Sequence, residues 1–256
     1  MRILLPAIAL TLLGAACGPG GAGPFQEYWR LDVGDCRRCA VAEGPAAVAV
    51  VADGNRLFLL RRDDGTLLWK EDLGTSPSRG LAFYGDAVLV GDWEGNLVAR
   101  EVGSGAERWR LTIPDRFHSP FTVQEEVLYC GAGERVYAID LARREVMWSV
   151  RLEEEADVRA RPVVEEARLF VQAGTHVYAL AAETGAKLWA YETTSYAGGD
   201  YSYPVAVGHG RVFSGTPTKN ILALDEDDGD VRWSSPVGKE VWNDRLVVEP
   251  HLYAGR

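Results

Sequence analysis

Tryptophan recurs along this 256-residue chain at an almost constant spacing. The intervals between successive positions are 40, 40, 39, 41 and 44 residues, and the positions are Trp29, Trp69, Trp109, Trp148, Trp189 and Trp233. A period near forty indicates a repeat protein in which each unit is one supersecondary element. Short alternating apolar runs, with no sustained 3.6-residue period, favour strands over helices. The sequence therefore predicts an all-β propeller of four-stranded antiparallel blades.

Each repeat also carries a turn signal at a fixed distance from its tryptophan. In four repeats a glycine lies four residues before the tryptophan, at Gly65, Gly105, Gly185 and Gly229. Glycine suits a tight turn between the third and fourth strands, because such a turn needs positive φ. Arg144 takes this place in the remaining repeat, so we expect that blade to turn with strain or through a different turn type.

The repeats resemble the PQQ-like β-propeller repeat. The segments that carry the resemblance best are Val177-Tyr-Ala-Leu180, Glu183-Thr-Gly-Ala-Lys-Leu-Trp189 and Ala223-Leu-Asp225. About five repeats are covered, from Ala40 to Trp233. Two kinds of protein share this repeat: quinoprotein dehydrogenases, and non-catalytic BamB-like lipoprotein scaffolds of outer-membrane protein assembly. The resemblance also implies that the six tryptophans are structural and lock neighbouring blades together.

The enzymes of this family are recognised by directly adjacent cysteines beside the quinone, a calcium ligand set with an acidic base, and a chain about twice this long. Here two arginines separate Cys36 from Cys39, and the four histidines have no metal-ligand spacing. We therefore predict no catalytic residues, no cofactor and no metal, and a non-enzymatic protein-binding scaffold. Two alternatives stay open: a propeller that binds a small ligand such as a sugar or quinone, and a remnant PQQ-dependent dehydrogenase.

The N-terminus has the pattern of a bacterial export signal. Residues 1–17 hold one arginine, an apolar run too short to span a bilayer, and Gly14-Ala-Ala-Cys17. Cys17 follows small residues, as at a lipoprotein processing site, so we predict its lipidation. Residues 18–25 form a flexible linker rich in glycine and proline, and residues 26–256 form the propeller domain. We expect an exported protein, lipid-anchored in the cell envelope on the periplasmic side.

The compartment and the charge narrow the chemistry further. In an exported protein Cys36 and Cys39 are expected to form a structural disulfide in a tight loop. The formal net charge of −10 argues against nucleic acid as a partner. The predicted partners are proteins of the cell envelope and, through the lipid, the membrane; the propeller itself is expected to be a monomer.

The two ends of the chain leave the number of blades open. Gln26–Gly34 has the pattern of a last strand with its tryptophan, and residues 245–256 have the pattern of a first and second strand. Joining them would close the ring with one blade built from both termini. That composite blade would lack one strand, so the ring is either six-bladed with an incomplete closing blade or part of a seven- or eight-bladed propeller.

Arginine and aromatic side chains gather in the segments that lead from one repeat into the next. In a closed ring these segments converge on one face, and Arg, Tyr and Trp dominate binding hot spots. The predicted binding-face residues are Arg79, Arg116, His118, Arg161, Tyr201, Tyr203, Trp242 and Arg245. The alternative role for this set is to seal loops and cover the ends of the sheets.

Overall fold

The computed structural model describes side chains at residues 39–52, 55–152, 157–193, 203, 205–216 and 218–236, and the backbone of strands at residues 9–14, 26–32, 246–249 and 251–254. All the regular structure in these residues is β-strand. This part of the chain has no helix that is long and apolar enough to cross a membrane.

Five four-stranded antiparallel sheets follow one another along the chain, each with its strands in sequence order. We call them blades B to F. Blade B holds β3 (Ala40–Glu43), β4 (Ala47–Ala52), β5 (Arg56–Arg61) and β6 (Leu67–Asp72); blade C holds β7 (Pro77–Tyr84), β8 (Ala87–Asp92), β9 (Asn96–Glu101) and β10 (Glu107–Thr112). Blade D holds β11 (Thr122–Gln124), β12 (Val127–Ala132), β13 (Arg135–Asp140) and β14 (Glu145–Arg151). Blade E holds β15 (Val163–Glu165), β16 (Arg168–Ala173), β17 (His176–Ala181) and β18 (Lys187–Glu192); blade F holds β19 (Val205–Gly208), β20 (Arg211–Gly215), β21 (Asn220–Asp225) and β22 (Val231–Pro236).

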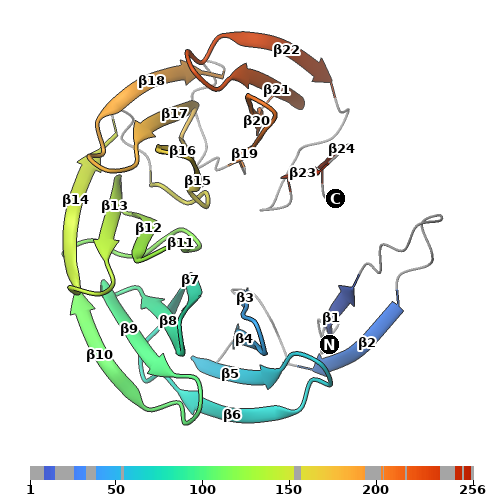
Figure 1. Cartoon of the computed structure of the whole chain (residues 1–256), viewed down its shortest axis with the longest axis vertical. Helices are drawn as coiled ribbons and strands as arrows, with labels where there is room; N and C mark the ends of the chain where they lie inside the picture. The colour runs from blue at the N-terminus through green and yellow to red at the C-terminus, as the bar shows by residue number, and fades with distance from the viewer. Residues whose placement is uncertain are drawn as a thin grey trace, which may run out of the picture.

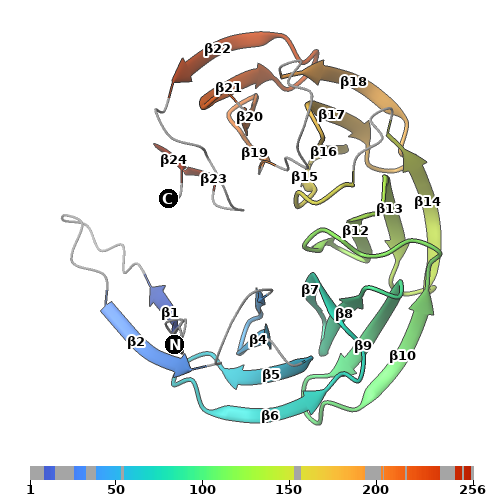
Figure 2. The same cartoon turned by 180° about the vertical axis from the view of Figure 1, so that it is seen from behind.

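The blades are arranged radially around a common centre (Figure 1), and the view from behind shows the same order (Figure 2). The first strand of each blade lies innermost and the fourth lies on the rim. The predicted propeller of four-stranded antiparallel blades is therefore confirmed. Because each blade is a meander, the turn between its second and third strands lies at the same end as the connection to the next blade. We call this end the connector face.

Each end of the chain forms a small sheet of its own. β1 (Ala9–Gly14) forms a two-stranded sheet with β2 (Gln26–Asp32), and β23 (Leu246–Glu249) forms another with β24 (His251–Ala254). Among the strands that the structure describes, no ladder joins one end of the chain to the other, and the number of blades in the complete ring stays a prediction.

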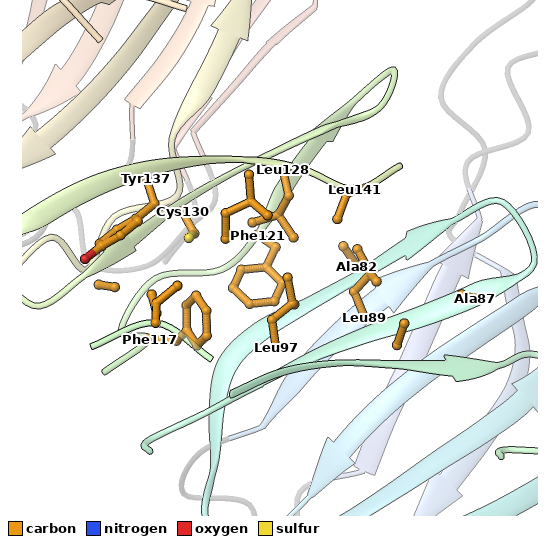
Figure 3. Packing of buried hydrophobic residues seen from close by; sticks show 14 residues of the cluster. Ala82, Ala87, Leu89, Leu97, Phe117, Phe121, Leu128, Cys130, Tyr137 and Leu141 are labelled. Carbon is orange, nitrogen blue, oxygen red and sulfur yellow. The ribbon is translucent and has the colours of Figure 1, made fainter. Parts of the chain in front are cut away.

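Apolar side chains fill the spaces between neighbouring blades. Between blades C and D, Phe117 and Phe121 meet edge to face with ring centroids 5.2 Å apart (Figure 3). Phe121 fits because the facing residue is glycine: a Cβ added at Gly80 would lie 2.3 Å from its ring. Successive strand residues face opposite neighbours, and the second strand of each complete blade is therefore almost wholly buried.

The turn glycines have the predicted conformation. Gly65, Gly105, Gly185 and Gly229 have φ between 69° and 77°, and the amide of each donates to the carbonyl four residues earlier. Arg144 makes the same turn with φ of 63°, and its amide donates to Asp140 O over 2.7 Å. Blade D thus keeps the turn type and accepts the strain, which costs an ordinary residue about 1–2 kcal/mol.

The repeat tryptophans connect each blade to the next one. The indole nitrogens of Trp69, Trp148 and Trp189 donate to carbonyls in the following blade, at Val102, Ala182 and Glu226, over 2.7, 3.0 and 3.1 Å. The indole rings lie on the turn glycines of that blade. An added Cβ would come within 3.1 Å of Trp69 at Gly105 and within 2.7 Å of Trp148 at Gly185. Glycine is therefore needed at these positions for two reasons. It allows the positive φ of the turn, and it leaves room for the indole ring of the preceding blade.

The junction between blades C and D uses another contact. Trp109 faces the blade whose turn has arginine in place of glycine, and the guanidinium carbon of Arg144 lies 5.8 Å from the centroid of its ring. A guanidinium over an indole face contributes about 0.5–1 kcal/mol at an exposed site. This attraction offsets part of the strain at Arg144.

Cys130 is expected to resist alkylation while the protein is folded. The thiol lies in β12, is fully buried and is free. Burial raises its pKa above the ordinary thiol value, so the reactive thiolate is suppressed. Iodoacetamide followed by peptide mapping should leave Cys130 unmodified in native buffer and modify it in concentrated guanidinium chloride. Rapid modification in native buffer would contradict the buried position.

Candidate binding face

The connector face of blades C, D and E is built by two interblade connections and one turn. The connection from blade C to blade D runs through residues 113–121, and the turn of blade D is Gly133-Glu134. Ile113 N donates to Gly95 O and Leu152 N donates to Glu134 O, so each connection begins against the turn of the blade it leaves. Residues far apart in the sequence are thereby brought to one surface.

A polar hollow of about 400 Å³ opens on this face. Its lining holds three carboxylates, two guanidinium groups and a glycine, from Asp115, Gly133, Glu134, Arg135, Arg151 and Asp157. Arg151 pairs with Glu134 at 2.5 Å, while Arg135 lies 3.9 Å from Asp115. The hollow therefore presents fixed charges of both signs, which suits a polar or charged ligand group better than an apolar one.

Tyr137 fixes the position of the Asp115 carboxylate. Its side chain is buried, and its hydroxyl donates to Asp115 Oδ2. Burial, followed by the hydrogen bond to this carboxylate, raises the pKa of Tyr137 above its ordinary value. The phenol thus stays a donor throughout the neutral range and fixes the carboxylate at the rim of the hollow.

Removing the Tyr137 hydroxyl should lower the stability of the protein by a measurable amount. Tyr137→Phe should lower the free energy of unfolding by about 1.5–3 kcal/mol, because a hydrogen bond to a charged group is lost. Tyr84→Phe is the matched control, since Tyr84 is only partly buried and its hydroxyl has no hydrogen bond to the described residues; its expected effect is under about 0.5 kcal/mol. Urea unfolding followed by circular dichroism measures both, and equal losses would contradict the assigned bond.

A second polar cluster crosses from the connection before blade D to the connection before blade E. His118 Nδ1 lies 3.1 Å from Asp157 Oδ2, and Arg159 donates to the same oxygen over 2.8 Å. The ring of His118 also lies 5.1 Å from that of Trp93 in the turn of blade C. Residues from three blades therefore meet at His118, whose side chain is only 11% exposed.

The predicted binding-face residues are brought together only in part. Arg79, Arg116 and Arg161 are exposed at the inner end of blades C, D and E. His118 is mostly buried, and its side chain links segments of neighbouring blades through Asp157 and Trp93. Tyr203, which was predicted to lie on the binding face, is instead buried: it is 2% exposed just before blade F begins. Tyr201, Trp242 and Arg245 lie outside the described residues.

The cysteine predictions are tested only at one residue. Cys39 is disulfide-bonded, but its predicted partner Cys36 lies outside the described residues, so the pairing stays a prediction. The predicted lipidation site Cys17 and the linker at 18–25 also lie outside them. Of the repeat tryptophans, Trp29 lies in β2, whose side chains are not described.

The carboxylates of the hollow were missed from the sequence. Asp115, Glu134 and Asp157 were not among the predicted residues, which were chosen as arginines and aromatics. The available signal was position, because Asp115 and Asp157 lie in the same connections as Arg116 and Arg161. Asp115 and Asp157 lie near Glu134 only because of the strand register of blade D, and sequence spacing alone could not predict this. Among the described residues, no group of three or more His, Cys, Asp or Glu is placed to hold a metal ion.

The radial blades, the tryptophan junctions and the charged connector face define this molecule as a β-propeller of PQQ-like repeats. A protein-family profile described as outer membrane protein assembly factor BamB matches residues 53–200 and 117–249. The chain belongs to this family. The predicted membership of the PQQ-like repeat family is thus confirmed.

Individual relatives agree with this assignment. The outer membrane protein assembly factor BamB of Nitrosomonas eutropha is 26% identical over 184 residues, which are 67% of this chain and 42% of the relative. The chain thus spans about two-fifths of the length of that curated relative. The crystal structure of BamB from Moraxella catarrhalis superposes with a TM-score of 0.68 at 16% identity, covering 92% of this chain and 80% of that one.

A quinohemoprotein alcohol dehydrogenase from Pseudomonas putida HK5 also has this fold. It superposes with a TM-score of 0.66 at 16% identity, covering 83% of this chain and 44% of the enzyme. At such identity the likeness extends to the fold alone, because one fold supports many functions.

Proposed function

We propose that this chain is a non-catalytic scaffold of the cell envelope that binds other proteins during outer-membrane protein assembly. The observation that carries the proposal is the family match, since that family is described as an outer membrane protein assembly factor. The connector face supports it physically. Exposed arginines beside a hollow of mixed charge are suited to a polar protein surface, and arginine is enriched at binding hot spots.

The proposed location is the periplasmic side of the bacterial envelope, with a lipid on Cys17 as the anchor. The signal-like residues 1–17 and the glycine- and proline-rich linker 18–25 support it. Membrane fractionation of the wild type and of Cys17→Ser tests this point. The wild type should sediment with membranes and the variant should be released in soluble form. Equal sedimentation of the two would contradict anchoring through Cys17.

In-cell crosslinking followed by purification of the tagged full-length protein from native membranes tests the scaffold role. Recovery of outer-membrane assembly components is the expected result. Recovery of no envelope protein under conditions that capture a known envelope complex would overturn the proposal.

Small-ligand binding is the second candidate, and the hollow is the feature that favours it. Its volume of about 400 Å³ lies within the range of small-molecule sites, and its lining offers both charge signs. Native mass spectrometry of protein purified from its own cells would detect a retained sugar. An absorbance spectrum of the same sample would detect a quinone. Co-purification of either molecule in a stoichiometric amount would favour this candidate over the scaffold.

A further inference from the structure

Three arginines on the connector face stand apart from the others. Every other arginine whose side chain the structure describes has an ion pair, a hydrogen bond or an aromatic contact. Arg79, Arg116 and Arg161 are exposed and have none of these within the described part of the chain. In a chain with a net charge of −10, carboxylates are plentiful. Three unpaired guanidinium groups therefore need an explanation from their surroundings.

Direct contacts bring the three arginines to adjoining segments. Gly80, next to Arg79, lies against the ring of Phe121. Thr122 Oγ1 donates over 2.5 Å to the carbonyl of Pro162, which follows Arg161. The inner ends of blades C and E thus contact the start of β11 at two successive residues.

Arg116 belongs to the same arrangement. It precedes Phe117, whose ring packs on Phe121, and both rings lie in the core between blades C and D (Figure 3). The backbone beside all three arginines is therefore fixed by buried packing, while their guanidinium groups remain in solvent. Three consecutive blades thus each present one exposed arginine beside packed backbone, and we call these three residues the arginine row.

We infer that Arg79, Arg116 and Arg161 bind an acidic segment of a protein partner. The inference rests on the proposed scaffold function and names the chemistry of the partner. A guanidinium group offers two parallel N–H donors that match a carboxylate, and such charge-assisted bonds are stronger than neutral ones. Complementary charge of this kind raises association rate and fixes register.

A polypeptide fits this surface better than an anionic membrane does. Asp115, Glu134 and Asp157 lie on the same face, so a dense sheet of lipid phosphates would meet carboxylates as well as arginines. The negative net charge of the whole molecule also disfavours approach to an anionic bilayer. A polypeptide can place its acidic side chains opposite the arginines and leave the carboxylates to water or to its own cations.

Fluorescence anisotropy with a labelled peptide in which glutamate alternates with serine tests the inference on the full-length protein. A matched peptide with glutamine in place of each glutamate is the negative control. The triple variant Arg79→Gln/Arg116→Gln/Arg161→Gln removes the row. The triple variant Arg61→Gln/Arg62→Gln/Arg143→Gln removes the same charge from turns at the opposite end of the blades. Anionic and neutral lipid vesicles are titrated in parallel, and thermal unfolding checks that both variants are folded.

The acidic peptide should bind the wild type and the control variant alike, and binding should weaken with salt. The row variant should bind roughly 10- to 100-fold more weakly, because each exposed pair contributes about 2- to 5-fold. Arginine-to-lysine replacements at the three positions should recover part of the loss. Equal loss in the control variant, equal binding of the glutamine peptide, or preference for anionic vesicles would each overturn the inference.

Crosslinking of the row variant in cells separates this inference from the proposed function. Loss of the recovered assembly components supports both. Recovery of those components at the wild-type level, with peptide binding unaffected, overturns the inference and leaves the scaffold role intact. Arginine-dependent peptide binding without any recovered envelope partner overturns the scaffold role and leaves the recognition chemistry standing.

Discussion

Trp189→Ala should lower the free energy of unfolding by about 3–5 kcal/mol, the range for a large aromatic side chain removed from a core. The ring is 9% exposed and lies 5.9 Å from Phe170, centroid to centroid. The turn of blade F closes over it, since a Cβ at Gly229 would be 2.7 Å away, and its indole donates to Glu226 O. Alanine would leave both a cavity and an unpaired carbonyl at this junction. Urea unfolding followed by circular dichroism measures the loss.

Trp233→Ala provides the matched control at the equivalent position of the last described blade. Trp233 packs on Phe213 but is 41% exposed. We expect about half the loss seen at Trp189, because the stabilisation scales with the apolar area removed from water. Equal losses at the two positions would contradict the role assigned to the following blade.

Gly95→Ala should lower the free energy of unfolding by about 2–5 kcal/mol, from backbone strain together with overpacking. Gly95 has φ of 84° in the turn of blade C. A Cβ there would lie 2.3 Å from the carbonyl oxygen of Ile113 and 2.8 Å from that of Asp115. Both contacts are with backbone, so the connection between blades C and D would have to move. That connection carries Arg116, and binding of the acidic peptide should weaken as well.

Two other glycines separate strain from steric overlap. Gly85 has φ of 56° with no atom within 4 Å of an added Cβ, so Gly85→Ala should cost only about 1–2 kcal/mol of strain. Gly103 has neither positive φ nor a close neighbour, and Gly103→Ala should be close to neutral. Chemical denaturation of the three variants ranks them. A Gly85 variant as unstable as the Gly95 variant would show that overlap with the connection contributes nothing.

The turn at Arg144 shows how far local sequence reasoning reaches. The repeat register places arginine where the other blades have glycine, and it predicts either strain or a different turn. The positive φ of Arg144 and its retained hydrogen bond show that the turn type is kept and that the backbone is strained. The contact with Trp109 could not be predicted, because it depends on the distance between two blades.

The site was predicted less well than the fold. Arginine and aromatic residues in the connections could be listed, yet burial could not be assigned from type alone. Tyr203 is enclosed and His118 is mostly covered, whereas Arg79 and Arg161 are exposed. Which arginines are paired depends on carboxylates in other segments, as Glu134 in the turn of blade D pairs with Arg151 in β14. Such pairs have no fixed sequence spacing.

The sequence predicts the all-β propeller, the period of its blades and the turn conformation at four glycines. It could do so because strand alternation, turn geometry and repetition are local properties written once per blade. Only the packing of the blades shows that Trp69, Trp148 and Trp189 each meet a carbonyl and a glycine of the next blade. It also shows that three arginines on one face have no partner among the described residues. These outcomes depend on how blades pack side by side, which sets distances between residues some thirty to sixty positions apart.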